Sequence, residues 1–302
     1  MKIFIILLIF LLNVNFAKSD IKECIEFFVK RDQERSISCI NEEIKKSPKN
    51  DMLYFIQGTI YTTFNNSPSA IDSFSKAIEL NPKNLGAYTS RANIYLYKGN
   101  YNNAISDLSM AVNLDKKESK TFSASLISQR GGAYQRIKLF KNANIDYKKA
   151  LSIFNDMSNI EWDEIKKRND KYDIKRGLYL DVYIGLCSCN ISLKNFDESL
   201  NYCKKAQDLD QESIIPKINL ASVYIELRQY FNAINTLNQI PKEKFETSFM
   251  ANYNFTVVNL RLFENTKDVK YEKQFKQSLL LTKQLAKNKE QIEVFNNFSS
   301  KL

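Results

Sequence analysis

The sequence of 302 residues contains no histidine, and it has only 7 glycines, 5 prolines and 1 tryptophan. The absence of histidine excludes imidazole acid–base catalysis, histidine triads and metal sites that depend on a histidine ligand. So few glycines leave little room for a glycine-rich phosphate loop, and the sequence contains no such motif. The scarcity of glycine and proline also argues against a turn-rich β fold. Because 44% of the residues are hydrophobic and no long strand-like alternation occurs, the chain is predicted to be all-α.

An internal repeat with a period of 34 residues runs from Asp51 to Glu118. Small and aromatic residues recur in register, in the pairs Gly58 and Ala92, Tyr61 and Tyr95, Ala70 and Ala104, Phe74 and Leu108, and Ala77 and Ala111. Spacings of three and four residues within each copy predict two helices, separated by a turn at 65–68. A period of this length is typical of a helix–turn–helix solenoid, in which small residues let paired helices approach closely.

This repeat resembles the tetratricopeptide repeat. The first copy matches the family pattern at Gly58, Tyr61, Ala70, Phe74, Ala77 and Pro82, and the second copy departs from it with Lys116 in place of proline. The resemblance implies an all-α, right-handed α-solenoid of stacked helix–turn–helix repeats that binds protein partners, with no cofactor and no metal. Asp and Glu residues fall on predicted solvent faces, which argues against an enzyme.

The periodicity divides the chain into segments. Residues 20–50 are predicted to be a degenerate N-terminal repeat that caps the stack, 51–118 to hold repeats 1 and 2, and 119–157 to hold a short insertion and repeat 3. Residues 158–179 are a charged helical insertion, for which a longer helix pair and a projecting arm both fit. Residues 180–247 are predicted to hold repeats 4 and 5, and 248–302 to form capping helices, with Met250, Tyr253, Val257 and Leu260 on one apolar stripe.

The N-terminus has the pattern of a signal peptide over residues 1–19. Lys2 precedes a nearly unbroken apolar run from Ile3 to Val14, which is shorter than the ~20 residues that a membrane span needs. Ala17-Lys18-Ser19 offers a cleavage site after Ser19, so we expect a periplasmic or secreted protein. The alternatives are an uncleaved membrane anchor and a secretory-pathway lumen. Glycosylation sequons at Asn65, Asn190, Asn254 and Asn297 include one on a packed helix position, which favours the periplasm.

Charge and cysteine content leave two further questions. The formal net charge is +10, and removal of Lys2 and Lys18 leaves 42 basic against 34 acidic residues, or +8. The basic residues are spread along the chain without a motif, which argues against nucleic acid as a partner.

Cys187 and Cys203 occupy repeat positions that face each other and are a candidate disulfide, as are Cys24 and Cys39. We favour the alternative, in which these cysteines are small buried apolar residues.

The resemblance also implies a concave groove lined by the first helices of successive repeats. The predicted peptide-binding residues are Thr89, Asn93, Tyr97, Ser128, Gln135 and Arg136. Their mostly neutral hydrogen-bonding side chains suit an extended peptide or a helix of a partner protein. The two-carboxylate clamp of the family is not expected, because Phe55, Thr59 and Ser90 stand where it needs basic or amide groups.

The sequence therefore predicts a non-catalytic, exported scaffold that binds a partner protein in its groove. The rival hypothesis is a structural subunit of a cell-envelope assembly, which docks through the convex face, the 158–179 segment or the C-terminal helices. An enzyme ranks third, because it would need a catalytic set without histidine.

Overall fold

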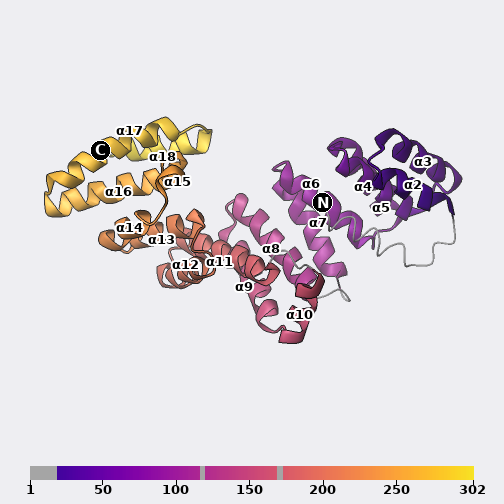
Figure 1. Ribbon diagram of the computed structural model, residues 1–302, viewed down its shortest axis with the longest axis horizontal. Coiled ribbons are helices and arrows are strands. Elements are labelled where there is room, and N and C mark those ends of the chain that lie inside the picture. Colours follow the sequence, from indigo (N-terminus) through magenta and orange to yellow (C-terminus); the bar gives the residue numbers. More distant parts are fainter. Residues whose placement is uncertain (1–18, 116–119, 169–172) are drawn as a thin grey trace. The chain divides into compact units, whose positions relative to one another are not determined.

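The computed structural model describes residues 19–115, 120–168 and 173–302, and the regular elements in these ranges are all α-helices (Figure 1). The all-α prediction is confirmed. The predicted signal segment lies outside the described residues, apart from Ser19 at the start of the first helix. The chain forms two compact units, residues 1–117 and 118–302, which are described separately as unit 1 and unit 2.

Unit 1 consists of three consecutive helix pairs. They are α2 (Ser19–Val29) with α3 (Gln33–Lys46), α4 (Asp51–Thr63) with α5 (Ser67–Leu80), and α6 (Leu85–Tyr97) with α7 (Tyr101–Leu114). The small residues of the repeat lie where the helices meet, and Ala70, Phe74 and Ala77 are fully buried. A Cβ atom on Gly58 would lie 2.7 Å from the ring of Phe74, so the close approach of α4 and α5 requires glycine there.

Asparagine side chains begin the helices of unit 1. Asn50, Asn66 and Asn84 accept hydrogen bonds from backbone N–H groups in the first turns of α4, α5 and α6. Each of these caps satisfies a donor that would otherwise lack an intrahelical partner. Asn84 also donates to the Asp51 carboxylate, 2.8 Å away, and this bond joins the starts of the first helices of two successive pairs.

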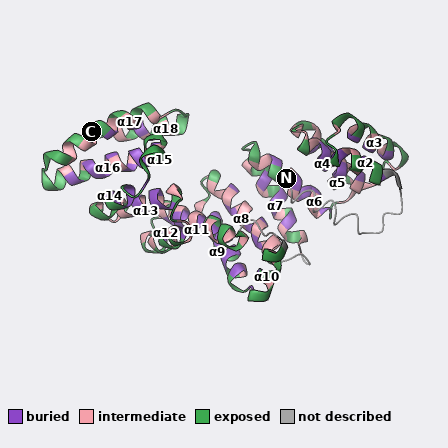
Figure 2. Cartoon of the chain, viewed as in Figure 1, coloured by how far each residue is buried: buried purple, intermediate pink, exposed green. Residues whose placement is uncertain are grey.

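Unit 2 contains eleven helices within its described residues. They are α8 (Lys120–Arg136), α9 (Phe140–Asn155), α10 (Asn159–Arg168), α11 (Ile174–Ser192), α12 (Phe196–Leu209), α13 (Ile214–Glu226), α14 (Tyr230–Leu237), α15 (Lys242–Thr247), α16 (Phe249–Thr266), α17 (Val269–Leu285) and α18 (Lys289–Ser299). Figure 2 shows that the buried residues lie mainly along helix surfaces facing neighbouring helices. α8 packs on α9, α11 on α12, and α13 on α14, so unit 2 also contains consecutive helix pairs.

The first insertion lengthens α8, and the second forms a separate helix, α10, and lengthens α11. Residues 120–123 form the first turn of α8, and the 158–179 segment contributes α10 and the first turns of α11. Trp162 of α10 is 6% exposed, and its ring centroid lies 5.9 Å from that of Phe154 and 6.0 Å from that of Tyr179. Because its aromatic side chain is packed between α9 and α11, α10 folds back on its neighbours instead of projecting freely.

The last helix pair does not follow the apolar stripe expected from the sequence. Met250 is 43% exposed, whereas Thr256 and Asn259 are fully buried. The Thr256 hydroxyl lies 3.0 Å from the hydroxyl of Thr282 on α17, so α16 and α17 meet along a partly polar seam. The apolar residues Val258 and Leu262 of α16 instead pack into a cluster with α13 and α14.

Candidate protein-binding faces

The first helix of each pair has one face turned away from its second helix, and we refer to this as the inner face. In unit 1 the predicted residues Thr89, Asn93 and Tyr97 lie four residues apart and form one row along the inner face of α6. The Thr89 hydroxyl donates to the Leu85 carbonyl at 2.9 Å. Asn93 is exposed, and Tyr97 is 90% exposed. The row therefore presents an aromatic ring and an amide to solvent.

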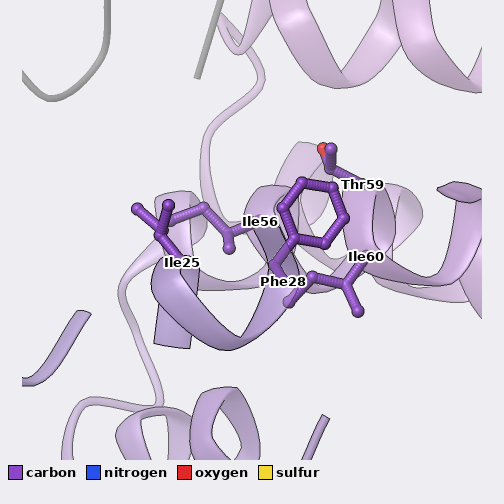
Figure 3. A pocket seen from close by; sticks show the side chains of 5 residues that line it. All are labelled: Ile25, Phe28, Ile56, Thr59 and Ile60. Carbon is purple, nitrogen blue, oxygen red and sulfur yellow. The ribbon is translucent and has the colours of Figure 1, made fainter. Parts of the chain in front are cut away.

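A crevice lies between α2 and α4, at the N-terminal end of unit 1 (Figure 3). Its lining consists of Ile25, Phe28, Ile56, Thr59 and Ile60, and it has no room for a water molecule. The Thr59 hydroxyl donates to the Phe55 carbonyl at 2.9 Å, so the single polar group of the lining is satisfied within its own helix. Phe28, Ile56 and Ile60 belong to the apolar core of this unit, and the crevice is a packing seam with no space for a ligand.

In unit 2 the predicted residues Ser128, Gln135 and Arg136 lie on α8. The Gln135 amide donates to the Ser188 hydroxyl of α11 at 3.0 Å, and its carbonyl oxygen accepts from the Tyr147 hydroxyl of α9 at 3.2 Å. Gln135 is thus held in place by two neighbouring helices. Ser128 is half-buried and Arg136 is exposed at the end of α8. The structure places three predicted residues in each unit, and their role in binding stays a prediction.

Tyr147 lies beneath the inner face where α8 and α11 meet. Its side chain is buried, and this burial raises the pKa of its hydroxyl above the ordinary value. A Cβ atom on Gly185 would lie 2.3 Å from the Tyr147 ring, so α11 can pack on this ring only because residue 185 is glycine. The neighbouring Cys189 thiol is also buried, which raises its pKa to about 12 and keeps it protonated near neutral pH.

The cysteines correct one preference drawn from the sequence. Cys187 is bonded to Cys203 and Cys24 to Cys39, whereas the sequence pattern favours the packing of free thiols. The Cα atoms of each pair lie only 5.1 Å and 5.3 Å apart, because the two helices of a repeat approach closely at these positions. Each disulfide therefore joins the first helix of a repeat to the second helix of the same repeat.

Two buried ion pairs were missed from the sequence. Arg91 donates to both carboxylate oxygens of Asp107 at 2.8 Å, and Arg130 donates to those of Asp146 at 2.7 and 2.8 Å. Hydrogen bonds to these carboxylates raise the pKa of both arginines. The signal was present, because each arginine precedes its aspartate by 16 residues and holds the seventh place of its repeat. These pairs join the two helices of repeats 2 and 3.

Two other kinds of site are absent from the described ranges. These ranges hold no group of three or more cysteine, aspartate or glutamate side chains that could bind a metal ion. None of the helices described in the structure is long and apolar enough to cross a membrane.

Comparison with known proteins agrees with this geometry. Two family models of the tetratricopeptide repeat match the sequence, one over residues 53–84 and the other over residues 73–106. These ranges span α4 to α7, in which Phe74 and the alanines close the helix pairs. Residues 53–106 contain tetratricopeptide repeats. Proteins with such repeats generally act as scaffolds for protein interactions.

Solved structures show the same fold at low sequence identity. A tetratricopeptide repeat protein from Parabacteroides merdae is 17% identical, with a TM-score of 0.53 over 91% of this chain and 95% of its own. PilF of Pseudomonas aeruginosa is 15% identical, with a TM-score of 0.53 over 83% of this chain and 98% of its own. YrrB, described as a tetratricopeptide repeat protein with an unusual peptide-binding site, is 16% identical, with a TM-score of 0.52 over 66% of this chain and 89% of its own. A search of curated protein sequences found no match.

Proposed function

We propose that this chain is a non-catalytic, exported scaffold that binds a segment of a partner protein along the inner faces of its first helices. The observation that carries the proposal is the row of Thr89, Asn93 and Tyr97 on α6. A tyrosine that is 90% exposed on a regular helix buries little of its ring within the chain. Tyrosine is enriched among the residues that dominate binding energy at protein interfaces, because its ring buries a large area and its hydroxyl still finds a partner.

The other members of the row support an extended segment or a helix as the bound element. Asn93 can both donate and accept hydrogen bonds, and such groups can pair with the backbone of a peptide. A spacing of four residues places the three side chains along one side of the helix, one turn apart. YrrB, which has the same fold, has a peptide-binding site, and this is consistent with the proposed mode.

Site-specific cross-linking tests this proposal. A photo-reactive phenylalanine analogue would replace Tyr97 in the full chain expressed in its own cells. The matched control is the same analogue at Met110, which is 40% exposed on the second helix α7. We expect a partner protein to be cross-linked from position 97 and not from position 110. If both positions gave the same products, or neither gave any, the inner face of α6 would not be the binding surface.

Export of the chain, to a compartment without glycosylation, is part of the proposal. The disulfides support export, and the buried sequons support the choice of compartment. Disulfides persist mainly in oxidising compartments such as the periplasm, and two are formed here. The sequon residues Asn190 and Asn254 are buried, and the Asn254 amide donates to the Ile218 carbonyl, so glycans at these positions would conflict with the fold. Mass spectrometry of the purified chain should find Asp20 as its first residue. An intact Met1 together with reduced cysteines would contradict export.

The rival proposal is a structural subunit of an envelope assembly that docks through the outer surface of unit 2. Two exposed isoleucines favour it, because Ile145 on α9 is 66% exposed and Ile160 on α10 is 73% exposed. Removing the whole 158–179 segment would also remove the buried side chain of Trp162. A sharper test replaces both isoleucines by serine and measures the size of the native assembly by gel filtration. An unchanged assembly would argue against docking through this surface.

A further inference from the structure

The inner faces of α8 and α11 lie side by side in unit 2 and run in the same direction. Both helices are antiparallel to α9. Arg130 of α8 forms an ion pair with Asp146 of α9. On α11, Tyr179 packs on Phe154 near the end of α9, and Asn190 accepts a hydrogen bond from Asn144 near its start. The hydrogen bond between Gln135 and Ser188 joins residues 53 positions apart. In parallel helices the same offset aligns Gly132 with Gly185 and Ser128 with Asp181, and Tyr147 lies next to both glycines.

The space over the two glycines differs. At Gly185 it is filled by the Tyr147 ring, which would lie 2.3 Å from an added Cβ atom, whereas at Gly132 it is open. A Cβ atom on Gly132 would meet only the Tyr147 hydroxyl, at 3.5 Å, and would otherwise enter open space. Hydroxyl groups border the seam, since Ser188 of α11 and Tyr147 of α9 both form hydrogen bonds with Gln135 of α8. The seam therefore has open space over Gly132, next to the hydrogen-bonding groups of Gln135, Ser188 and Tyr147.

Asp181 is the acidic residue of this seam, and it has no counter-ion. It forms no ion pair or hydrogen bond within the described part of the chain. Its helical neighbours one turn away are Gly177, Leu178, Ile184 and Gly185, none of which carries a charge. Asp181 is exposed as a residue, but partial desolvation of its carboxyl group raises the pKa, and no cation offsets this effect. The chain has an excess of basic residues, yet none of those in the described ranges serves this carboxylate.

An exposed aliphatic residue lies one repeat further along the same face. Ile215 is 52% exposed near the start of α13, and it follows Asp181 by 34 residues, the length of one repeat. α11 and α13 are in contact within unit 2. Lysine and arginine side chains carry their charge at the end of an apolar stem. A carboxylate with an exposed isoleucine one helix away matches both parts of such a side chain.

We infer that the inner face of α8, α11 and α13 selects a partner segment carrying a lysine or arginine, whose cationic group pairs with the exposed carboxylate of Asp181 at the edge of the open space over Gly132. This inference rests on the proposed binding of a partner segment and specifies its chemistry. The segment's cation would supply the counter-ion that Asp181 lacks, and its stem would cover Ile215. The family's two-carboxylate clamp has the opposite polarity, since it binds anionic groups.

Selection from a library of random twelve-residue peptides displayed on phage tests the inference with the oxidised full chain as bait. The matched baits are Asp181→Asn, which removes the charge and keeps the shape, and Asp208→Asn, which changes a second aspartate, on α12. We expect lysine or arginine to be enriched at one position by the wild-type chain and by Asp208→Asn. With Asp181→Asn this enrichment should disappear.

A selected peptide should then be measured by fluorescence anisotropy against all three baits. Asp181→Asn should weaken binding on the order of tenfold, the size expected for one charge-assisted hydrogen bond. Binding to the wild-type chain should also weaken with added salt more than binding to the variant does. Circular dichroism would show that the variant retains its helices.

The possible failures separate the two proposals. If no peptide sequence is enriched by the wild-type chain, binding of peptide segments itself is contradicted. If an enriched motif lacks a basic residue, or is unchanged with Asp181→Asn, peptide binding stands and the role of Asp181 is refuted.

Discussion

The disulfide between Cys24 and Cys39 should provide a large part of the stability of the first helix pair. This pair has polar residues where the repeat pattern places alanine, namely Ser36 and Glu43, both of them buried. The Ser36 hydroxyl donates to the Asp32 carbonyl, and Glu43 pairs with Lys46 at 2.6 Å, so these groups are satisfied but add little apolar contact. The covalent bond between α2 and α3 compensates for this weak packing.

The magnitude follows from the length of the loop that the disulfide closes. Cys24 and Cys39 are 15 residues apart. Closing a loop of that length lowers the entropy of the unfolded chain, and this raises the free energy of unfolding by about 3 kcal/mol at 25 °C. The pair Cys187–Cys203 closes a loop of nearly the same length, with a separation of 16. Replacing either pair by two alanines should therefore destabilise the helix pair that contains it by about 3 kcal/mol.

Hydrogen exchange measured by mass spectrometry can localise this effect. In the Cys24→Ala, Cys39→Ala variant, we expect faster exchange in α2 and α3, while α11 and α12 exchange as in the wild-type chain. The Cys187→Ala, Cys203→Ala variant is the matched control and should show the reverse. Stability in tandem repeats depends mainly on contacts between neighbours, so each effect should remain local.

Counting thiols supplies the decisive control. The denatured chain should show one reactive thiol, that of Cys189, before reduction and 5 after it. Finding all of them reactive before reduction, or finding equal exchange in α2 and α3 with and without the disulfide, would refute this reasoning.

The remaining predictions concern single positions in unit 2. Lys194 adopts a φ of 62°, a left-handed conformation that is costly for a residue with a side chain, so Lys194→Gly should raise the melting temperature through a gain of about 1 kcal/mol. Gly185→Ala should lower stability by about 1–3 kcal/mol in denaturant unfolding, because the added methyl would meet the Tyr147 ring. Arg130→Met should cost about 3–5 kcal/mol in the same measurement, because it leaves Asp146 buried without its partner.

Each of these variants has a control within the chain. Gly99 occupies the same turn position in unit 1 with a φ of 76°, so Gly99→Lys should destabilise where Lys194→Gly stabilises. Gly132→Ala should have little effect, since its Cβ would meet only one atom, at 3.5 Å. Replacing Arg130 and Asp146 together by apolar residues should recover most of the loss, because no uncompensated charge remains. For each pair, a result that reverses the expected difference between the variant and its control would contradict the stated cause.

The sequence predicted the repeated part of the fold well, for a physical reason. A helix pair that packs on copies of itself must place small residues at the same positions each time, so Gly58, Ala70 and Ala77 recur as a visible pattern. The same register predicted that Cys187 and Cys203 face each other. The choice between a bond and simple packing depended on the distance between two helices, which a sequence pattern does not contain.

The buried polar residues could not be predicted from the periodicity of apolar residues in the sequence. α16 buries Thr256 and Asn259, and a search for hydrophobic periodicity assigns such residues to the surface. The ion pairs of Arg91 and Arg130 were not predicted for the same reason, because such a search assigns charged residues to the solvent-facing surface. The sequence likewise does not show that Asp181 lies near Gly132 and Gly185, or that it has no counter-ion there.

The disulfides also determine how the chain would respond to a mechanical pull on its two ends. Stacked helix pairs can unwind one after another under tension, and each freed residue adds roughly 3.5 Å of length. Because each disulfide bridges about 15 residues of one pair, the chain between the two sulfurs cannot extend, which shortens the fully stretched molecule by about 50 Å per disulfide. One locked loop lies in the first pair and the other in the fourth repeat, while the pairs between them remain free to lengthen. Under force the chain should therefore lengthen everywhere except in these two loops, and a reductant would allow both loops to extend.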